Sequence, residues 1–303
     1  MILVAGATGM VGGMIARALL QQRHSVRVLV REGSPYDSLV ERGAQPALGD
    51  LKDAPSLVDA CRGVDVVVTT ASAGERGGAD TPQRVDVEGN RHLIEAASGA
   101  GVRQFVFVSA LAASLDHPVP VVRAKAETEL ALRESGLAHT IVAANCFMDI
   151  MFAVVVGDRL MAGQPVTLVG EGRRRHSFVA ARDVAAFAVA AVNHPAAVNR
   201  RIAIGGPEAL SWRDVVGVYE RALGRTATVQ WIAPGELLPD LPPVPGLAPL
   251  VSGLMAGLEA FDSPVDMTDT ASTFGVTSTS VADFVASVRT TPNAAASAAN
   301  SRA

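Results

Sequence analysis

The first twelve residues constrain the fold of this chain most strongly. Residues 2–5 are a short apolar run that leads into three spaced glycines, and apolar residues then recur at helical spacing over residues 15–20. A strand, a glycine turn and a helix in this order are typical of a dinucleotide-binding fingerprint. Gly6 permits the tight turn, Gly9 lets backbone N–H groups approach a pyrophosphate, and Gly12 lets the helix pack closely on the sheet. The residues expected to contact a dinucleotide here are Gly6, Thr8, Gly9, Met10, Val11 and Gly12.

Composition and charge exclude several classes of partner. Hydrophobic residues make up 49% of the 303 residues and charged residues 18%, enough apolar material for a large core. The net charge of −4 and the lack of a long basic block argue against nucleic acid or a membrane surface as partner. The longest apolar stretch, residues 141–156, is too short to span a membrane, and no signal peptide precedes the first strand. We expect a cytoplasmic monomer or homodimer.

The two cysteines carry no metal or disulfide signal. Cys61 and Cys146 are far apart in the chain and lack metal-ligand or CxxC spacing. The sequence therefore predicts reduced thiols and no metal site.

Apolar runs and helical periodicity alternate through the first half of the chain. After residues 2–5, we expect strands at residues 25–30, 45–48, 64–70, 105–109 and 140–143, with helices between them. The later helices are expected at residues 85–99 and 123–135. Such alternation predicts an α/β fold with a doubly wound parallel sheet, a Rossmann domain over residues 1–144.

The regular alternation of expected strands and helices ends after residue 144. Short strands at residues 166–169, 202–204 and 228–231 and helices at residues 182–193, 212–223 and 281–288 predict a smaller, mixed C-terminal substrate lobe over residues 145–289. Some of its segments can return to the Rossmann domain. Asp183 is interpreted as a helix N-cap. Residues 234–249 contain six prolines, which predicts irregular structure, and residues 290–303 are expected to be a disordered tail.

The order of these motifs resembles the atypical short-chain dehydrogenase/reductases, specifically the NmrA-like family with its quinone reductases and isoflavone-reductase relatives. The resemblance rests on the glycine turn, Val30-Arg31, Gly49-Asp50-Leu51, Phe107-Val108-Ser109-Ala110, Lys125 with Glu127, Ser177-Phe178-Val179 before Asp183-Val184-Ala185, and Ile204-Gly205-Gly206-Pro207-Glu208. It implies a Rossmann fold, a bound nicotinamide dinucleotide and a small-molecule substrate.

Arg31 indicates which dinucleotide is bound. It ends the second expected strand, where an NAD-specific site places an acidic residue on the ribose 2′-hydroxyl. A guanidinium there pairs instead with a 2′-phosphate, as in similar proteins, with Ser34 nearby to help. The alternative is a solvated arginine neutralised by Glu32. We expect NADP(H) to be preferred over NAD(H). The other expected cofactor contacts are Asp50, Leu51, Thr70, Ala71, Ser72 and Lys125.

The active site departs from the Tyr-x-x-x-Lys pattern that ordinary short-chain reductases carry on a helix. Lys125 stands at the lysine position, but Val121 replaces the tyrosine that donates a proton. Three accounts remain open. The acceptor can be a quinone-like molecule that needs no positioned acid, or Lys125 can act as acid or base, as the corresponding lysine does in isoflavone-reductase relatives. Otherwise the protein binds the dinucleotide without turnover. Lys125 can equally be a ribose-binding lysine.

Two further residues are candidates for catalysis and three for substrate binding. Ser109 ends the fifth strand, where it either hydrogen-bonds a substrate carbonyl or satisfies the local backbone. His117 is an alternative acid or a solvated loop histidine. Phe147, Met148 and Met151 follow the sixth strand, where they either flank an aromatic ligand or belong to the core.

These residues predict an NADPH-dependent reductase of a quinone-like or conjugated aromatic molecule. One alternative is a non-catalytic NADP(H)-sensing regulator of the NmrA type. Another is a non-redox enzyme, an isomerase or dehydratase, on the same fold.

Overall fold

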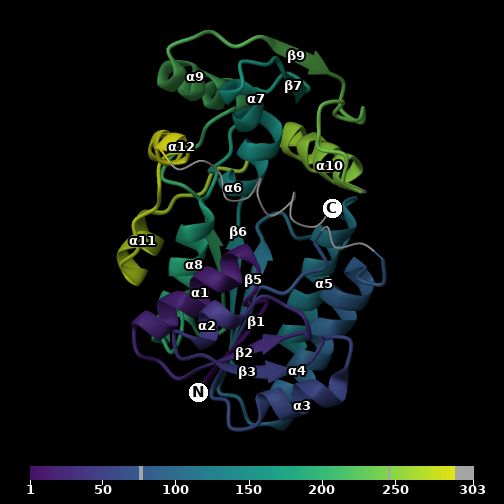
Figure 1. Ribbon diagram of the computed structural model, residues 1–303, viewed down its shortest axis with the longest axis vertical. Coiled ribbons are helices and arrows are strands. Elements are labelled where there is room, and N and C mark those ends of the chain that lie inside the picture. Colours follow the sequence, from purple (N-terminus) through teal and green to yellow (C-terminus); the bar gives the residue numbers. More distant parts are fainter. Residues whose placement is uncertain (75–77, 245, 291–303) are drawn as a thin grey trace.

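The computed structural model describes residues 1–74, 78–244 and 246–290. Its centre is a seven-stranded parallel sheet in the order β3-β2-β1-β4-β5-β6-β8. Figure 1 shows helices on both sides of this sheet. The strands are β1 (Ile2–Ala5), β2 (Val26–Val30), β3 (Gln45–Leu48), β4 (Val66–Thr69), β5 (Gln104–Ala110), β6 (His139–Ala144) and β8 (Arg200–Ile204). The central strands β1 and β4 are fully buried and apolar except for Thr69, because helices cover both faces of the sheet. The expected doubly wound fold is confirmed.

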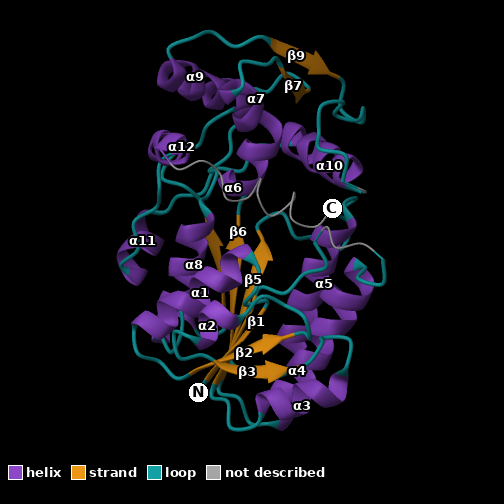
Figure 2. Ribbon diagram, in the orientation of Figure 1, coloured by secondary structure: helices purple, strands orange, loops and turns teal. Residues whose placement is uncertain are grey.

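Helices cover the sheet in two layers (Figure 2). One face packs against α1 (Met10–Gln21) and α8 (Ala181–Ala190), with the short α2 (Asp37–Val40) beside them. The other face packs against α3 (Ala54–Cys61), α4 (Asn90–Gly99) and α5 (Pro120–Glu134). A π-helical segment, η1 (Pro82–Gly89), precedes α4 without a break, so the helical region begins three residues before the expected residue 85.

The second half of the chain contributes to both parts of the molecule. Strand β8 pairs in parallel with β6 at the sheet edge, after the 3-10 turn η3 (Pro195–Ala197), and α8 packs on α1. The rest forms an upper lobe with its own core. This lobe contains α6 (Met148–Met151), η2 (Phe152–Gly157), α7 (Asp158–Met161), the parallel pair β7 (Val166–Val169) and β9 (Val229–Ile232), α9 (Trp212–Leu223), α10 (Leu247–Ala260) and α12 (Val281–Thr290).

Phe152 lies at the centre of the upper core. Its ring makes edge-on contacts with Phe178 at 5.0 Å and Trp212 at 5.7 Å between ring centroids. Such aromatic contacts stabilise a core beyond the area they bury. Helix α9 begins with a capping box of Ser211 and Asp214, at the residue expected from the sequence.

The structure corrects several expectations for the second half. Helix α10 begins at Leu247 and contains Pro249, because proline in a first helical turn removes no intrahelical hydrogen bond. The helical residues 148–161 and α11 (Thr268–Phe274) had no clear sequence signal. Asp183 is not an N-cap, because α8 begins at Ala181, and its carboxylate accepts hydrogen bonds from Thr279. The expected disordered tail lies outside the described residues, apart from residue 290 at the end of α12. No helix within the described ranges is long and apolar enough to cross a membrane.

Candidate cofactor and substrate cleft

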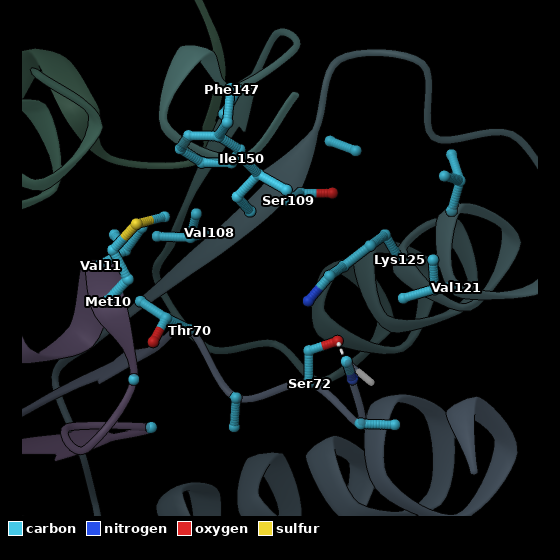
Figure 3. Close-up of a pocket in the computed structure, with 18 of the residues that line it drawn as sticks. Met10, Val11, Thr70, Ser72, Val108, Ser109, Val121, Lys125, Phe147 and Ile150 are labelled. Carbon is cyan, nitrogen blue, oxygen red and sulfur yellow. Dashed lines mark hydrogen bonds between the residues drawn. The ribbon is translucent and has the colours of Figure 1, made fainter. Parts of the chain in front are cut away.

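A cavity of about 680 Å³ lies at the carboxyl ends of the sheet strands, beneath the upper lobe. Parallel α/β sheets bind their ligands at this edge. Figure 3 shows side chains from the glycine turn, β5, α5 and the segment after β6 around one open space. Cofactor and substrate candidates therefore share one cavity.

The glycine turn fits a pyrophosphate. Gly6 has a φ of +82°, which favours glycine. A Cβ on Gly12 would lie 2.2 Å from the Gly6 carbonyl oxygen, so only glycine allows α1 to approach β1 this closely. The N-cap residue Gly9 provides no side-chain cap, which leaves the first N–H groups of α1 available to a ligand. Gly6, Thr8, Gly9, Met10 and Val11 line the cavity, whereas Gly12 lies behind the turn.

Five more of the residues expected to contact the cofactor also line the cavity, namely Asp50, Leu51, Thr70, Ala71 and Ser72. The backbone N–H of Gly74 donates to the Ser72 hydroxyl at 3.4 Å, which ties the start of the loop after β4. The Asp50 carboxylate accepts a hydrogen bond from the Lys52 backbone N–H at 2.9 Å and therefore forms a turn as well as lining the cavity.

Arg31 and Ser34 line the end of the cavity that lies beside β2. The Arg31 guanidinium pairs with Asp80 at 3.0 Å, not with the neighbouring Glu32. Asp80 also pairs with Lys52. Sequence analysis did not predict this cluster, because its three charged residues come from separate segments.

Lys125 projects from α5 toward the middle of the cavity (Figure 3). Its Nζ lies 3.5 Å from Oδ1 of Asp86 and 5.0 Å from the centroid of the Phe107 ring. Asp86 is fully buried and its Oδ2 accepts a hydrogen bond from the Ala73 N–H at 2.8 Å. Val121, one helical turn before Lys125, lines the same cavity, so an apolar side chain occupies the place of the missing phenol.

Ser109 lines the cavity but its hydroxyl is engaged. Oγ donates to Oε1 of Glu129 on α5 at 2.6 Å, and both side chains are buried. Arg201 of β8 donates from Nε to Oε2 of the same carboxylate at 3.0 Å. The sequence offered a substrate carbonyl or the local backbone as partners for Ser109, and the structure provides a buried carboxylate.

His117 reaches the cavity from the loop before α5. Its Nδ1 accepts a hydrogen bond from the Val119 N–H at 3.1 Å, which leaves Nε2 to carry the proton of the neutral ring. Burial lowers the pKa of His117 below its usual value. The neutral ring can therefore donate a hydrogen bond into the cavity at neutral pH.

The upper part of the cavity is apolar. Phe147 and Met151 line it as expected, but Met148 is fully buried in the upper core and is absent from the wall. Sequence analysis missed the contributions of Ile150, of Leu254 and Leu258 on α10, and of Phe261 just after that helix. Burial raises the pKa of the Cys146 thiol to about 12, so this cavity residue is a poor nucleophile.

The described parts of the chain contain no group of three or more residues that could hold a metal ion. The cleft instead suits an organic ligand with two unlike ends. The glycine turn and Arg31 suit phosphates at one end, and the apolar wall suits a ring at the other.

Comparison with known proteins identifies the family. The model of the NmrA-like family matches residues 1–267. The NAD(P)H azoreductase of Xenophilus azovorans is 34% identical over 74% of this chain and 74% of its own. The photosystem II assembly factor Ycf39 of Cyanophora paradoxa is 32% identical over 75% of this chain and 70% of its own.

Solved structures share the fold across almost the whole chain. The NADPH-dependent quinone oxidoreductase QOR2 of Escherichia coli, solved with NADPH, has a TM-score of 0.80 at 21% identity and covers 95% of this chain and 99% of its own. The triphenylmethane reductase of Citrobacter sp., solved with NADP(H), has a TM-score of 0.79 at 18% identity and covers 94% and 99%. The resemblance drawn from the sequence is confirmed, and the chain belongs to the NmrA-like family.

Proposed function

We propose that this chain is an NADPH-dependent oxidoreductase that reduces an uncharged aromatic or conjugated acceptor of the quinone type. The observation that carries the proposal is the single cavity that joins the glycine turn to an apolar wall from the upper lobe. A dinucleotide with its phosphates on the start of α1 reaches from Arg31 toward Lys125. Its nicotinamide end then lies below Phe147, Ile150 and Met151.

The charges around the cavity favour a neutral acceptor. Lys125 faces Asp86, and Arg31 faces Asp80, so each cation on the wall has an anionic partner. The wall formed by Phe147, Ile150 and α10 is apolar. Flat conjugated molecules gain most from such a wall because they bury apolar area without leaving a charge unpaired.

The lack of a positioned phenol favours an acceptor that is easily reduced. Val121 replaces the tyrosine, and the chain's two tyrosines are absent from the cavity wall. Tyr219 is buried in the upper core, where burial raises its pKa. A bound nicotinamide supplies a hydride, which turns a quinone into a hydroquinone anion that then takes one proton from water. A simple ketone would form a strongly basic alkoxide and needs an acid beside it.

Lys125 in this scheme is a binding group. Its ammonium points into the cavity (Figure 3) and lies 3.5 Å from Oδ1 of Asp86. In sequence, Lys125 stands at the lysine of the Tyr-x-x-x-Lys pattern, which holds the ribose hydroxyls in ordinary short-chain reductases. It orients the nicotinamide ribose through charge-assisted hydrogen bonds.

The names of the relatives agree with this class of acceptor. An azoreductase, a quinone oxidoreductase and a triphenylmethane reductase all act on conjugated molecules, and two of them were solved with NADPH or NADP(H). None of these names implies reduction of an isolated ketone.

A panel of acceptors tests the proposal. The purified chain is mixed with NADPH and a benzoquinone, a naphthoquinone, an azo dye, an aldehyde or a ketone, and nicotinamide absorbance is followed. Oxidation of NADPH in the presence of the quinones or the azo dye, but not in the presence of the ketone, supports the proposal. Oxidation by the ketone alone contradicts it.

A second candidate function is dinucleotide-dependent binding without turnover. Two observations favour it: Val121 removes the usual acid, and the Ser109 hydroxyl donates to Glu129 rather than into the cavity. A relative named as an assembly factor agrees with such a role. Tight NADPH binding without oxidation by any acceptor favours this candidate, whereas conversion of a substrate at constant nicotinamide absorbance indicates a non-redox isomerase or dehydratase.

A further inference from the structure

The strongest unexplained feature of the cleft is an ion-pair cluster at its adenosine end. One carboxylate oxygen of Asp80 pairs with the Arg31 guanidinium at 3.0 Å, and the other pairs with the Lys52 ammonium. Lys52 is also 3.5 Å from Oδ2 of Asp50. The Asp80 side chain is only 11% exposed, whereas that of Arg31 is 42% exposed, so the guanidinium remains open to a ligand on its other side.

The position of this cluster matches the place expected for a 2′-phosphate. Arg31, Ser34 and Asp50 line both the main cavity and an adjoining polar hollow that Thr8 also reaches. Arg31 follows β2, the strand end beside which a dinucleotide fold places the adenosine ribose. Asp80 comes from the segment after β4, lines the same cavity and pairs with the guanidinium at 3.0 Å.

We propose that Asp80 is a specificity-determining residue that competes with the 2′-phosphate of NADP(H) for Arg31 and Lys52. This inference rests on the proposed function and deepens it. A 2′-phosphate brings close to two negative charges and three acceptor oxygens, so it can displace a single carboxylate from Arg31. The Asp80 carboxylate must give up part of its pairing when NADP(H) binds. NAD(H) has no such phosphate and leaves the pairs intact.

Two consequences follow for the cofactor preference. Asp80 lowers the affinity for NADP(H) but not the affinity for NAD(H). It therefore reduces the ratio by which the chain prefers NADP(H) over NAD(H). In the Asp80→Asn variant, Lys52 loses this carboxylate partner and becomes a second cation of the 2′-phosphate site. Both effects on cofactor affinity are of moderate size, because partly exposed ion pairs contribute little free energy.

The experiment is a titration of the full chain with NADPH, NADH, 2′,5′-ADP and AMP at one fixed ionic strength. Asp80→Asn removes the charge and keeps the shape of the side chain. Glu32→Gln is the matched control, because it removes one negative charge from the same polar hollow and the structure shows no ion pair for Glu32 among the described residues. We expect Asp80→Asn to lower the Kd for NADPH and 2′,5′-ADP about fivefold. The Kd values for NADH and AMP should stay the same, and Glu32→Gln should have a smaller effect.

Further variants separate the inference from the proposed function. In the Arg31→Ala background, Asp80→Asn should improve NADPH binding less than in the parent chain, because the Arg31 guanidinium for which Asp80 competes is gone. Lys52→Met should weaken NADPH binding more than NADH binding, a readout that remains if Asp80→Asn fails to fold. Equal improvement for NADPH and NADH, or no change for either, overturns the role of Asp80. If Arg31→Ala itself leaves NADPH binding unchanged, the proposed 2′-phosphate site is wrong.

Discussion

The Ser109 hydroxyl donates its hydrogen bond to the Glu129 carboxylate at 2.6 Å, away from any ligand in the cavity. Arg201 holds the same carboxylate and also donates to the carbonyl oxygens of Ala110 and Leu111, both at 3.0 Å. A residue of the edge strand β8 therefore supports the segment that continues β5 along the cavity wall. The Ser109 oxygen can still accept a hydrogen bond, but its proton is directed toward Glu129.

This geometry predicts a small role for Ser109 in turnover. Ser109→Ala should lower kcat/KM for quinone reduction by less than about threefold, because no donor to the acceptor carbonyl is lost. Steady-state kinetics with NADPH and a benzoquinone measure it, with Ser72→Ala as a second cavity serine for comparison. A loss of about a hundredfold would mean that the hydroxyl turns toward the acceptor during turnover.

Replacement of Lys125 should affect cofactor binding first. Lys125→Met is expected to raise the Kd for NADPH about tenfold, because a charge-assisted hydrogen bond to the ribose is lost. It also leaves the buried Asp86 without its cation, so the double variant Lys125→Met/Asp86→Asn should regain stability against urea. The measurements are NADPH titration and the pH profile of kcat. An unchanged Kd, together with loss of one limb of the pH profile, would assign Lys125 a proton-transfer role instead.

Val121 offers a test by gain of function. Val121→Tyr places a phenol one helical turn before Lys125, on the cavity wall, and should give measurable aldehyde reduction. Val121→Phe is the matched control, since it adds the ring without the hydroxyl. Aldehyde reduction that is equal in both variants, or highest in the parent chain, would show that the missing phenol does not limit the range of acceptors.

Stability should fall on mild acidification because of two histidines, His117 in the cavity wall and the buried His176. Partial burial of His117 and burial of His176 lower the pKa of each ring below its ordinary value of about 6.5. In each case the unfolded chain takes up the proton first as the pH falls below 6.5, so the free energy of unfolding decreases there and is level above it. Urea unfolding at about pH 5.5 and about pH 7.5 measures the difference. His176→Asn should reduce this difference, and an equal loss in variant and parent would contradict the assignment.

Much of the Rossmann half could be predicted because its signals are local. The apolar run of β1, the turn at Gly6 and the spacing of apolar residues in α1 are neighbours in sequence and in space. The six strands β1 to β6 were expected in or near their final positions for the same reason. The strands β7, β8 and β9 were also expected from short apolar runs, but their places in the fold were not. The site residues of the glycine turn and of β2 followed from this framework.

The missed features depend on contacts between distant segments. Glu129 lies on α5 and has no local feature that marks it as the partner of Ser109, and Asp80 meets Arg31 only across the folded cleft. Strand β8 is short and polar at its start, so its return to the sheet beside β6 depends on pairing rather than on pattern. Met148 was expected in the pocket because its helical phase was unknown, and it faces the upper core.

A single-turnover experiment tests the central claim most directly. The protein is saturated with NADPH, or with NADPH deuterated at the transferred hydrogen, and is mixed rapidly with a quinone. The account predicts quinone-dependent oxidation that is slower with the deuterated cofactor, since the bond to that hydrogen breaks in the chemical step. Tight NADPH binding with no oxidation by any quinone or azo dye would contradict it.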